Sequence, residues 1–198
     1  MAWEELARDA DRENSKSRDR LVGVYIGILA VVLAICSLGG SNANQDSTEQ
    51  YIAASNVWAF FQAKNARRQA LRLHTDEFEM MLKTTPTMPD DVKKSIETKI
   101  ADYREQDKKL TSDPKSGEGL DELFNKGKAL EALRDRAEQQ GPYFDYGQAL
   151  LQIAIVLASV AIISGGNLLL FGSFVLGALG AVATFGGFTL AFPLPFAG

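Results

Sequence analysis

The C-terminal part of the chain carries no charge. Beyond Asp145 the sequence has no Asp, Glu, Lys, Arg or His before it ends at Gly198. Two apolar segments lie in this run, at 147–164 and 168–191, and a Gly-Gly-Asn turn separates them. A transmembrane helix needs about 20 apolar residues to cross a hydrocarbon core of roughly 30 Å. The run is therefore long enough for two crossings, and it predicts a transmembrane hairpin, 147–198, that ends in a short apolar tail.

Another apolar segment lies near the N-terminus. Residues 21–38 are uncharged and predict a first transmembrane helix within 21–40, preceded by a charged N-terminal segment, 1–20. A signal peptide is the alternative, but the apolar run exceeds the usual length of roughly 7–15 residues. The residues that follow, Gly39-Gly40-Ser41-Asn42, are expected to end, kink or loosen this helix at the membrane interface.

The charged residues are confined to two blocks. The 21 Lys and Arg and the 25 Asp and Glu residues lie within 4–20 and 46–145. The segment 41–146 predicts three helices, at about 46–83, 89–110 and 118–140, because apolar residues recur at helical spacing between Pro- and Gly-rich turns. Gly141-Pro142 is expected to break the chain before the second span. The predicted fold is all-α: an integral membrane protein with three transmembrane helices and an extramembrane helical domain, an antiparallel three-helix bundle or coiled coil.

The distribution of Lys and Arg predicts an orientation. Residues 1–20 hold five of these cations, whereas residues 41–60 hold none. Because cation-rich flanks stay on the cytoplasmic side, we expect a cytoplasmic N-terminus and a 41–146 domain on the opposite side. Lys128, Arg134 and Arg136 before the second span argue the other way, but cations in loops longer than about 60 residues count for less.

Small residues recur four positions apart in both C-terminal spans. They are Ala154 and Ala158 in one span, and Ser173, Gly177 and Ala181 in the other. This spacing lets membrane helices approach closely. We expect these faces to pack the hairpin against itself or against the first span; an intermolecular interface is the alternative.

The stretch 53–70 combines aromatic and cationic side chains. Residues three and four apart share a face of a helix, which groups Trp58, Phe61, Lys64, Arg67 and Arg68 on two adjoining faces. Aromatic rings near the membrane with cations beyond them can contact lipid headgroups or an acidic protein partner. A lipid contact requires a bend at Gly39–Asn42. The alternative is that the aromatic residues form the core of the helical domain and the cations its solvated rim.

The sequence contains no recognisable catalytic motif. His74, the only histidine, stands near Asp76 and Glu77 as on a solvated helix face, and the only cysteine, Cys36, has apolar neighbours that favour a packing role. The sequence lacks a phosphate-binding loop, a dinucleotide motif and Cys/His metal spacing. A net charge of -4 argues against nucleic-acid binding. We therefore expect no enzyme activity, no cofactor, no metal and no small-molecule substrate.

Two stretches of the sequence resemble a known family. LAICSLGG at 33–40 with SNVWAFFQAKNARRQA at 55–70, and LQIAIVLASVAIISGGNLLLFGSFVLGALG at 151–180, are similar to a bacterial membrane-protein family catalogued as domain of unknown function 4337. The resemblance implies one span, a helical insert and a terminal hairpin, and it supplies no activity. For a bacterial protein, the orientation predicted above places a multi-pass chain in the inner (cytoplasmic) membrane with residues 41–146 in the periplasm.

These patterns lead to two functional hypotheses. The first is a non-catalytic, membrane-anchored scaffold or accessory subunit that binds other proteins through its helical domain and its spans. The alternative is a small oligomeric channel or transport component, although no ionisable residue lies within any predicted span. The expected partners are the lipid bilayer and either other membrane protein subunits or further copies of the chain.

Overall fold

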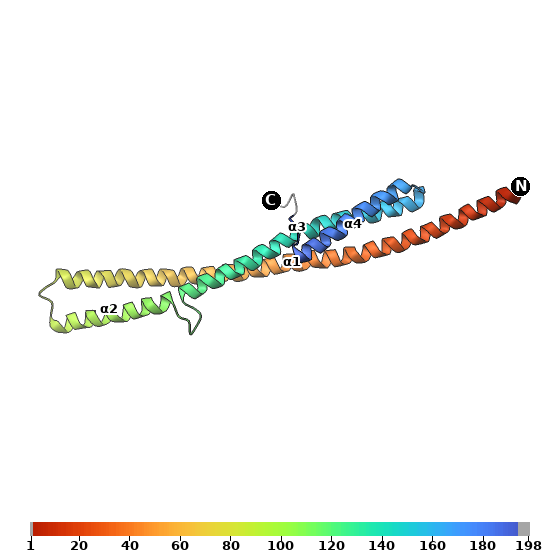
Figure 1. Ribbon diagram of the computed structural model, residues 1–198. Coiled ribbons are helices and arrows are strands. Elements are labelled where there is room, and N and C mark those ends of the chain that lie inside the picture. Colours follow the sequence, from red (N-terminus) through yellow and green to blue (C-terminus); the bar gives the residue numbers. More distant parts are fainter. Residues whose placement is uncertain (1, 194–198) are drawn as a thin grey trace. The chain divides into compact units, whose positions relative to one another are not determined.

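The computed structural model describes the backbone of residues 2–193 and the side chains from Lys16 to Pro193 (Figure 1). Within these residues the chain forms the helices α1 (Ala2–Thr84), α2 (Asp90–Thr111), α3 (Leu120–Ser164) and α4 (Asn167–Thr189), and no strand. The all-α prediction is therefore confirmed for this part of the chain. The side chains of the N-terminal segment before Lys16 and the apolar tail after Pro193 lie outside the described residues.

The chain divides into two compact units. Unit 1 comprises residues 1–47 and 135–198, and unit 2 comprises residues 48–134. In α1, α3 and α4 a segment is long and apolar enough to cross a membrane. The outward side chains of these segments, such as Leu21, Ile163 and Phe171, are large, apolar and exposed. Such surfaces suit contact with lipid rather than water, which agrees with the predicted membrane association.

The core of unit 1 lies between α1 and α3. Leu29 and Cys36 of α1 pack with Phe144, Leu151 and Ala154 of α3, and all five side chains are buried. The Cys36 thiol donates a hydrogen bond to the carbonyl oxygen of Phe144 at 3.3 Å. Cys36 is thus a packing residue, as its apolar surroundings predicted.

The glycines at the end of the first span do not interrupt the helix. The prediction that Gly39–Asn42 ends it is wrong, since α1 continues through these residues as helix. The rings of Phe144 and Phe188 occupy the space in which a Gly39 side chain would stand: a Cβ there would overlap the Phe144 ring and lie 2.8 Å from Phe188. Gly39 therefore admits two aromatic rings against the helix and has a packing role.

The predicted break at Gly141-Pro142 is also absent. Proline removes one hydrogen bond from a helix interior and usually kinks or breaks it, yet α3 runs through Pro142 from Leu120 to Ser164. The next two residues, Tyr143 and Phe144, are buried at 5% and 2% exposure. Burial of these rings offsets the cost of a proline in a helix interior, which is about 3 kcal/mol.

Polar groups within unit 1 bind one another. The Tyr25 hydroxyl donates to the carbonyl oxygen of Ser173 at 3.0 Å, and the Ser173 hydroxyl donates to the carbonyl oxygen of Ala154 at 2.7 Å. At one end of the unit, the Arg18 guanidinium donates to the carbonyl oxygen of Gly165, in the turn between α3 and α4, at 3.3 Å. The cationic start of the first span and the hairpin turn therefore lie at the same end of unit 1.

Unit 2 consists of two antiparallel helix pairs that share α1. The helix α2 contacts the part of α1 near Arg72, and Arg72 binds Asp107 at 2.8 Å. The start of α3 contacts a different part of α1, near Trp58, and Trp58 binds Glu131. In Figure 1, α2 and the start of α3 follow one another along α1. These contacts differ from a bundle in which three helices lie side by side.

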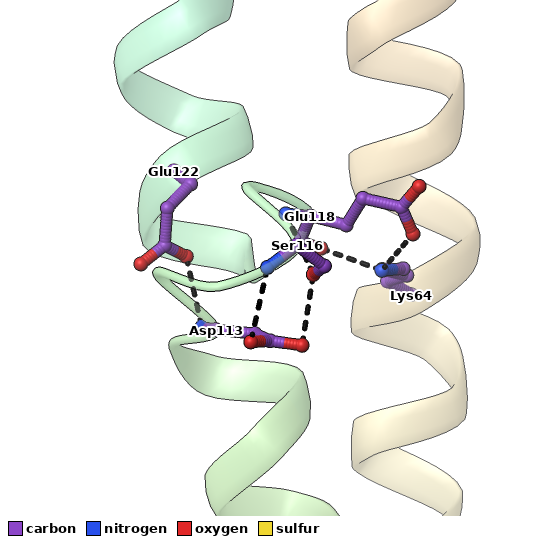
Figure 2. A network of polar contacts seen from close by, with 5 residues as sticks. All are labelled: Lys64, Asp113, Ser116, Glu118 and Glu122. Carbon is purple, nitrogen blue, oxygen red and sulfur yellow. Dashed lines mark hydrogen bonds and ion pairs between the residues drawn. The ribbon is translucent and has the colours of Figure 1, made fainter.

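The loop between α2 and α3 explains this arrangement (Figure 2). Glu122 of α3 accepts hydrogen bonds from the Ser112 hydroxyl and the Asp113 amide, which join the end of α2 directly to the start of α3. Inside the loop, Asp113 accepts bonds from the amide and hydroxyl of Ser116. The chain therefore continues in the direction of α2 and does not fold back beside it.

Candidate functional site

Trp58 is the centre of an aromatic cluster in unit 2. Its ring lies edge-on to Phe61 and Phe124, with centroid distances of 5.5 Å and 5.7 Å. A Cβ at Gly127 would lie 2.8 Å from the indole, so the absence of a side chain there gives the ring its place against α3. The indole N–H donates to the Glu131 carboxylate at 2.9 Å. Trp58 and Phe61 are half-buried and join α1 to α3, the arrangement expected of core residues.

The three cations of the stretch have different surroundings. The Lys64 ammonium donates to the carbonyl oxygen of Glu118 at 2.6 Å and to its carboxylate at 3.2 Å (Figure 2). The Arg68 guanidinium donates to the Thr111 hydroxyl at 3.4 Å. Arg67 is exposed. Lys64 thus holds the α2–α3 loop, and Arg68 contacts the last residue of α2.

Single Gln substitutions are expected to separate these roles. Lys64→Gln and Arg68→Gln each remove a bond between helices and should lower the stability of unit 2 by about 0.5–1 kcal/mol. Arg67→Gln should leave stability unchanged and should weaken retention of an acidic protein partner at low salt. Circular dichroism of the heated, detergent-extracted protein and co-purification of the partner at low and high salt measure the two effects. Equal destabilisation by Arg67→Gln would contradict the assignment.

The small residues of the C-terminal spans lie where the helices of unit 1 meet. Ala154, Ala158 and Ser173 are each fully buried, and Gly177 is buried too. A Cβ at Gly177 would lie 2.7 Å from the Tyr25 hydroxyl and 3.0 Å from Leu29, both on α1. Ala181 is only half-buried.

A groove runs along α1 and α3 beside Trp58. It has a volume of about 330 Å³, and its lining includes the small residues Ser55 and Ala59 of α1. Gln62 of α1 and Glu131 and Arg134 of α3 give it a polar edge. The lining of the groove therefore combines apolar surface with hydrogen-bonding groups in similar measure.

Unit 2 also exposes large apolar side chains that the motif analysis did not single out. Ile52 and Leu73 lie on the outer face of α1, and Met80, Met81 and Val92 lie near the turn between α1 and α2. A sequence signal for this outer face was present, because apolar residues recur there every seven positions, at Ile52, Ala59, Ala66 and Leu73. Exposed apolar groups of this size are typical of surfaces that contact another protein or a membrane.

Four carboxylates of unit 2 have pKa values below their usual range, and for Glu105 the main cause is the hydrogen bond from Lys109. For Glu131 the main cause is the hydrogen bond from Lys128, with a further one from Trp58. For Glu122 it is the bond from Ser112, and for Asp113 the bond from Ser116. These bonds all favour the charged form of the carboxylate.

Unit 2 is therefore expected to lose stability in acid. A carboxylate with a lowered folded-state pKa stabilises the fold above its unfolded pKa, and that contribution disappears as the pH falls through the folded value, from about pH 5 downward. Glu122→Gln should lower the melting temperature at pH 7 and flatten its dependence on pH. Glu97→Gln, an exposed substitution on α2, is the matched control. Identical pH profiles for wild type and Glu122→Gln would contradict this assignment.

A family model described as Domain of unknown function (DUF4337) matches residues 18–190. The chain belongs to this family. Neither the curated proteins nor the solved structures give a match. The DUF4337 region includes the apolar segments at 21–38, 147–164 and 168–190, and it also covers the aromatic–cationic stretch and the small-residue faces.

Metal-binding chemistry is not evident within the described part of this DUF4337 chain. No group of three or more His, Cys, Asp or Glu side chains there is placed to hold a metal ion. His74 lies on the surface with its Nδ1 atom 3.1 Å from Glu77, one helical turn away. The described surface has three places where another helix could pack: the groove beside Trp58, the outer face of α1, and the apolar side chains near the α1–α2 turn.

Proposed function

We propose that this protein is a non-catalytic, membrane-anchored scaffold or accessory subunit. Segments of α1, α3 and α4 anchor it in the bilayer, and unit 2 binds another protein. The observation that carries this proposal is the apolar end of unit 2, where Met80, Met81 and Val92 are 65%, 45% and 42% exposed beside the α1–α2 turn. Methionine is flexible and polarisable, which makes it common on surfaces that adapt to a partner.

The charged groups of unit 2 support a binding role over a catalytic one. Arg72 pairs with Asp107, Arg104 with Glu79 at 2.6 Å, and Lys64 with Glu118, so these ions join the unit's own helices. Such pairs fix the geometry of a surface that presents apolar side chains. We therefore assign no catalytic residue in this proposal.

The orientation we propose follows from unit 1. Arg18 binds the hairpin turn at Gly165, so both belong to the same side of the bilayer. The cation-rich flank of a span faces the cytoplasm. In a bacterial inner membrane, unit 2 would then lie in the periplasm and meet periplasmic or membrane-bound partners there.

The alternative, a small oligomeric channel, draws no support from the polar groups of unit 1. Tyr25, Ser173 and Thr184 donate their hydroxyl hydrogens to backbone carbonyl oxygens within the unit. A pore would instead direct such groups to a water-filled path. We retain the scaffold as the proposed function.

Photo-cross-linking in cells tests this proposal. A photoreactive residue in place of Met80 should form an adduct with one defined foreign protein, and the same residue in place of Lys94, exposed on α2, should not. Met81→Lys should reduce the adduct at Met80, because a charge in the apolar contact opposes binding. The absence of any adduct at Met80, or equal adducts at both positions, would contradict the proposal.

A further inference from the structure

The outer face of α1 in unit 2 carries a regular repeat of apolar and small residues with one asparagine. Its members are separated alternately by four and three residues, and each of them is exposed. They are Ile52, Asn56, Ala59, Ala63, Ala66, Ala70 and Leu73. Ile52 and Leu73, at its two ends, are 54% and 59% exposed. A mean spacing of about 3.5 residues is the pattern by which one helix packs lengthwise against another.

This repeat, which we name the α1 seam, has clear limits. The positions that would continue it are Glu49 on one side and Glu77 on the other, and both carry a carboxylate. Charged residues are depleted from the centres of such contacts. The α1 seam therefore covers residues 52–73, which is about three repeats of seven residues. It lies apart from the Met80 end to which the proposed function assigns a partner.

We propose that the α1 seam pairs with the α1 seam of a second copy of this chain, with the two helices parallel. Four alanines let the two backbones approach closely, and the same repeat on both helices makes their spacing match. Asn56 occupies a core position, where a single asparagine specifies register and favours a parallel pair. Copies inserted the same way in one bilayer have their α1 helices running in the same direction, which also requires a parallel pair.

The groove beside Trp58 gives the second copy a place to insert a side chain. In a parallel coiled coil, the residue that precedes one core position faces the partner residue that lies about five positions further along. Ser55 thus faces Phe60 of the second copy. Phe60 is 42% exposed, and Ser55 lines the groove of about 330 Å³. The exposed ring and the groove are therefore complementary, and each copy supplies both.

Charge complements this fit at the next position along the helix. By the same spacing, Gln62 faces Arg67 of the second copy. Gln62 and the Glu131 carboxylate both border the groove, so they offer acceptors to that guanidinium. Arg67, exposed in the single chain, would thus gain partners in the pair. This inference does not depend on the proposed function, because two copies can pair through the α1 seam whether or not unit 2 also binds a foreign protein.

Disulfide cross-linking in native membranes tests the pairing. In a Cys36→Ser background, single cysteines replace Ala59, Ala63, Ala66 and Ala70. In a parallel, in-register pair each cysteine faces itself across the seam, within reach of the Cα–Cα distance of roughly 4.4–6.8 Å that a disulfide requires. All four variants should give a product of twice the chain mass. Ala101→Cys, an exposed alanine on α2, is the matched control and should give none.

Each other outcome overturns the inference. A product at one seam position alone would indicate an antiparallel pair, and a product of another mass would indicate a foreign protein on the seam. No product at any seam position, or an equal product at Ala101, would show that the copies do not pair there. Adding Ala63→Glu to Ala66→Cys should reduce the linked fraction by roughly tenfold or more, since two carboxylates would be buried face to face. Its helical content should stay unchanged, because Ala63 is exposed in the single chain.

Discussion

Trp58→Ala is expected to destabilise unit 2 more strongly than the loss of any of its ion pairs. It removes the edge-on contacts with Phe61 and Phe124 and leaves Glu131 without its indole donor. Truncation of a buried tryptophan to alanine costs roughly 3–5 kcal/mol, and because this ring is half-buried we expect about 2–3 kcal/mol. Thermal unfolding of the detergent-extracted protein, followed by circular dichroism, measures the loss.

A matched control separates packing from general sensitivity to aromatic loss. Tyr51 is also an aromatic residue of α1 in unit 2, but it is 59% exposed. Tyr51→Ala should therefore change stability by less than about 0.5 kcal/mol, as surface substitutions usually do. If Trp58→Ala melted like the wild type and lost lipid or partner binding instead, the ring would be a contact residue and its core assignment would be wrong.

Gly177→Leu is expected to produce the largest effect in unit 1. Even a Cβ at this position would lie 2.7 Å from the Tyr25 hydroxyl and 3.0 Å from Leu29, and a leucine adds three further carbons. Overpacking a close contact costs typically about 1–3 kcal/mol. Separation of α4 from α1 would also stretch the bond between Tyr25 and Ser173. The variant should lose thermal stability and extract poorly in mild detergent.

Gly27→Leu makes the same chemical change where space is open. No atom lies within 4 Å of a Cβ at Gly27, so this variant should retain the stability of the wild type. Equal behaviour of Gly177→Leu and Gly27→Leu would mean that α4 does not pack on α1 at Gly177. The pair of variants thus tests the helix contact directly.

Local composition was sufficient to predict helical structure and the apolar spans, but not that α1 and α3 each run unbroken from a span into unit 2. The charge-free segments mark their own positions, because the length and polarity of each decide whether it can cross a bilayer. The turn at Pro86–Pro89 and the start of α2 at Asp90 were predictable for the same reason, since proline and acidic residues act on their own neighbourhood.

Local composition did not predict that Gly39 and Pro142 lie within continuous helices. Gly39 keeps its place in α1 because of Phe144 and Phe188, which lie more than a hundred residues further along the chain. Pro142 stays within α3 because Tyr143 and Phe144 are buried. Both outcomes depend on contacts between distant segments, which the local sequence does not reveal.

The aromatic–cationic stretch shows the same limit within unit 2. Helical spacing predicted correctly that Trp58 and Phe61 share a face, and their rings do make contact. Whether that face would be covered depended on Phe124 and Gly127, on a helix that begins more than fifty residues later. The outer repeat of α1 needs no such knowledge, because its seven-residue spacing is present in the sequence alone.

The central proposal is that the first two spans place unit 2 on the opposite side of the membrane from the cationic N-terminal flank and the hairpin turn. Single cysteines at Ser17, Ala101 and Asn167, in a Cys36→Ser background, can be labelled with a membrane-impermeant maleimide in cells whose outer membrane has been permeabilised. We predict labelling of Ala101→Cys while the inner membrane is intact, and labelling of Ser17→Cys and Asn167→Cys only after the inner membrane is opened. Labelling of Ala101→Cys and Asn167→Cys from the same side would contradict this proposal.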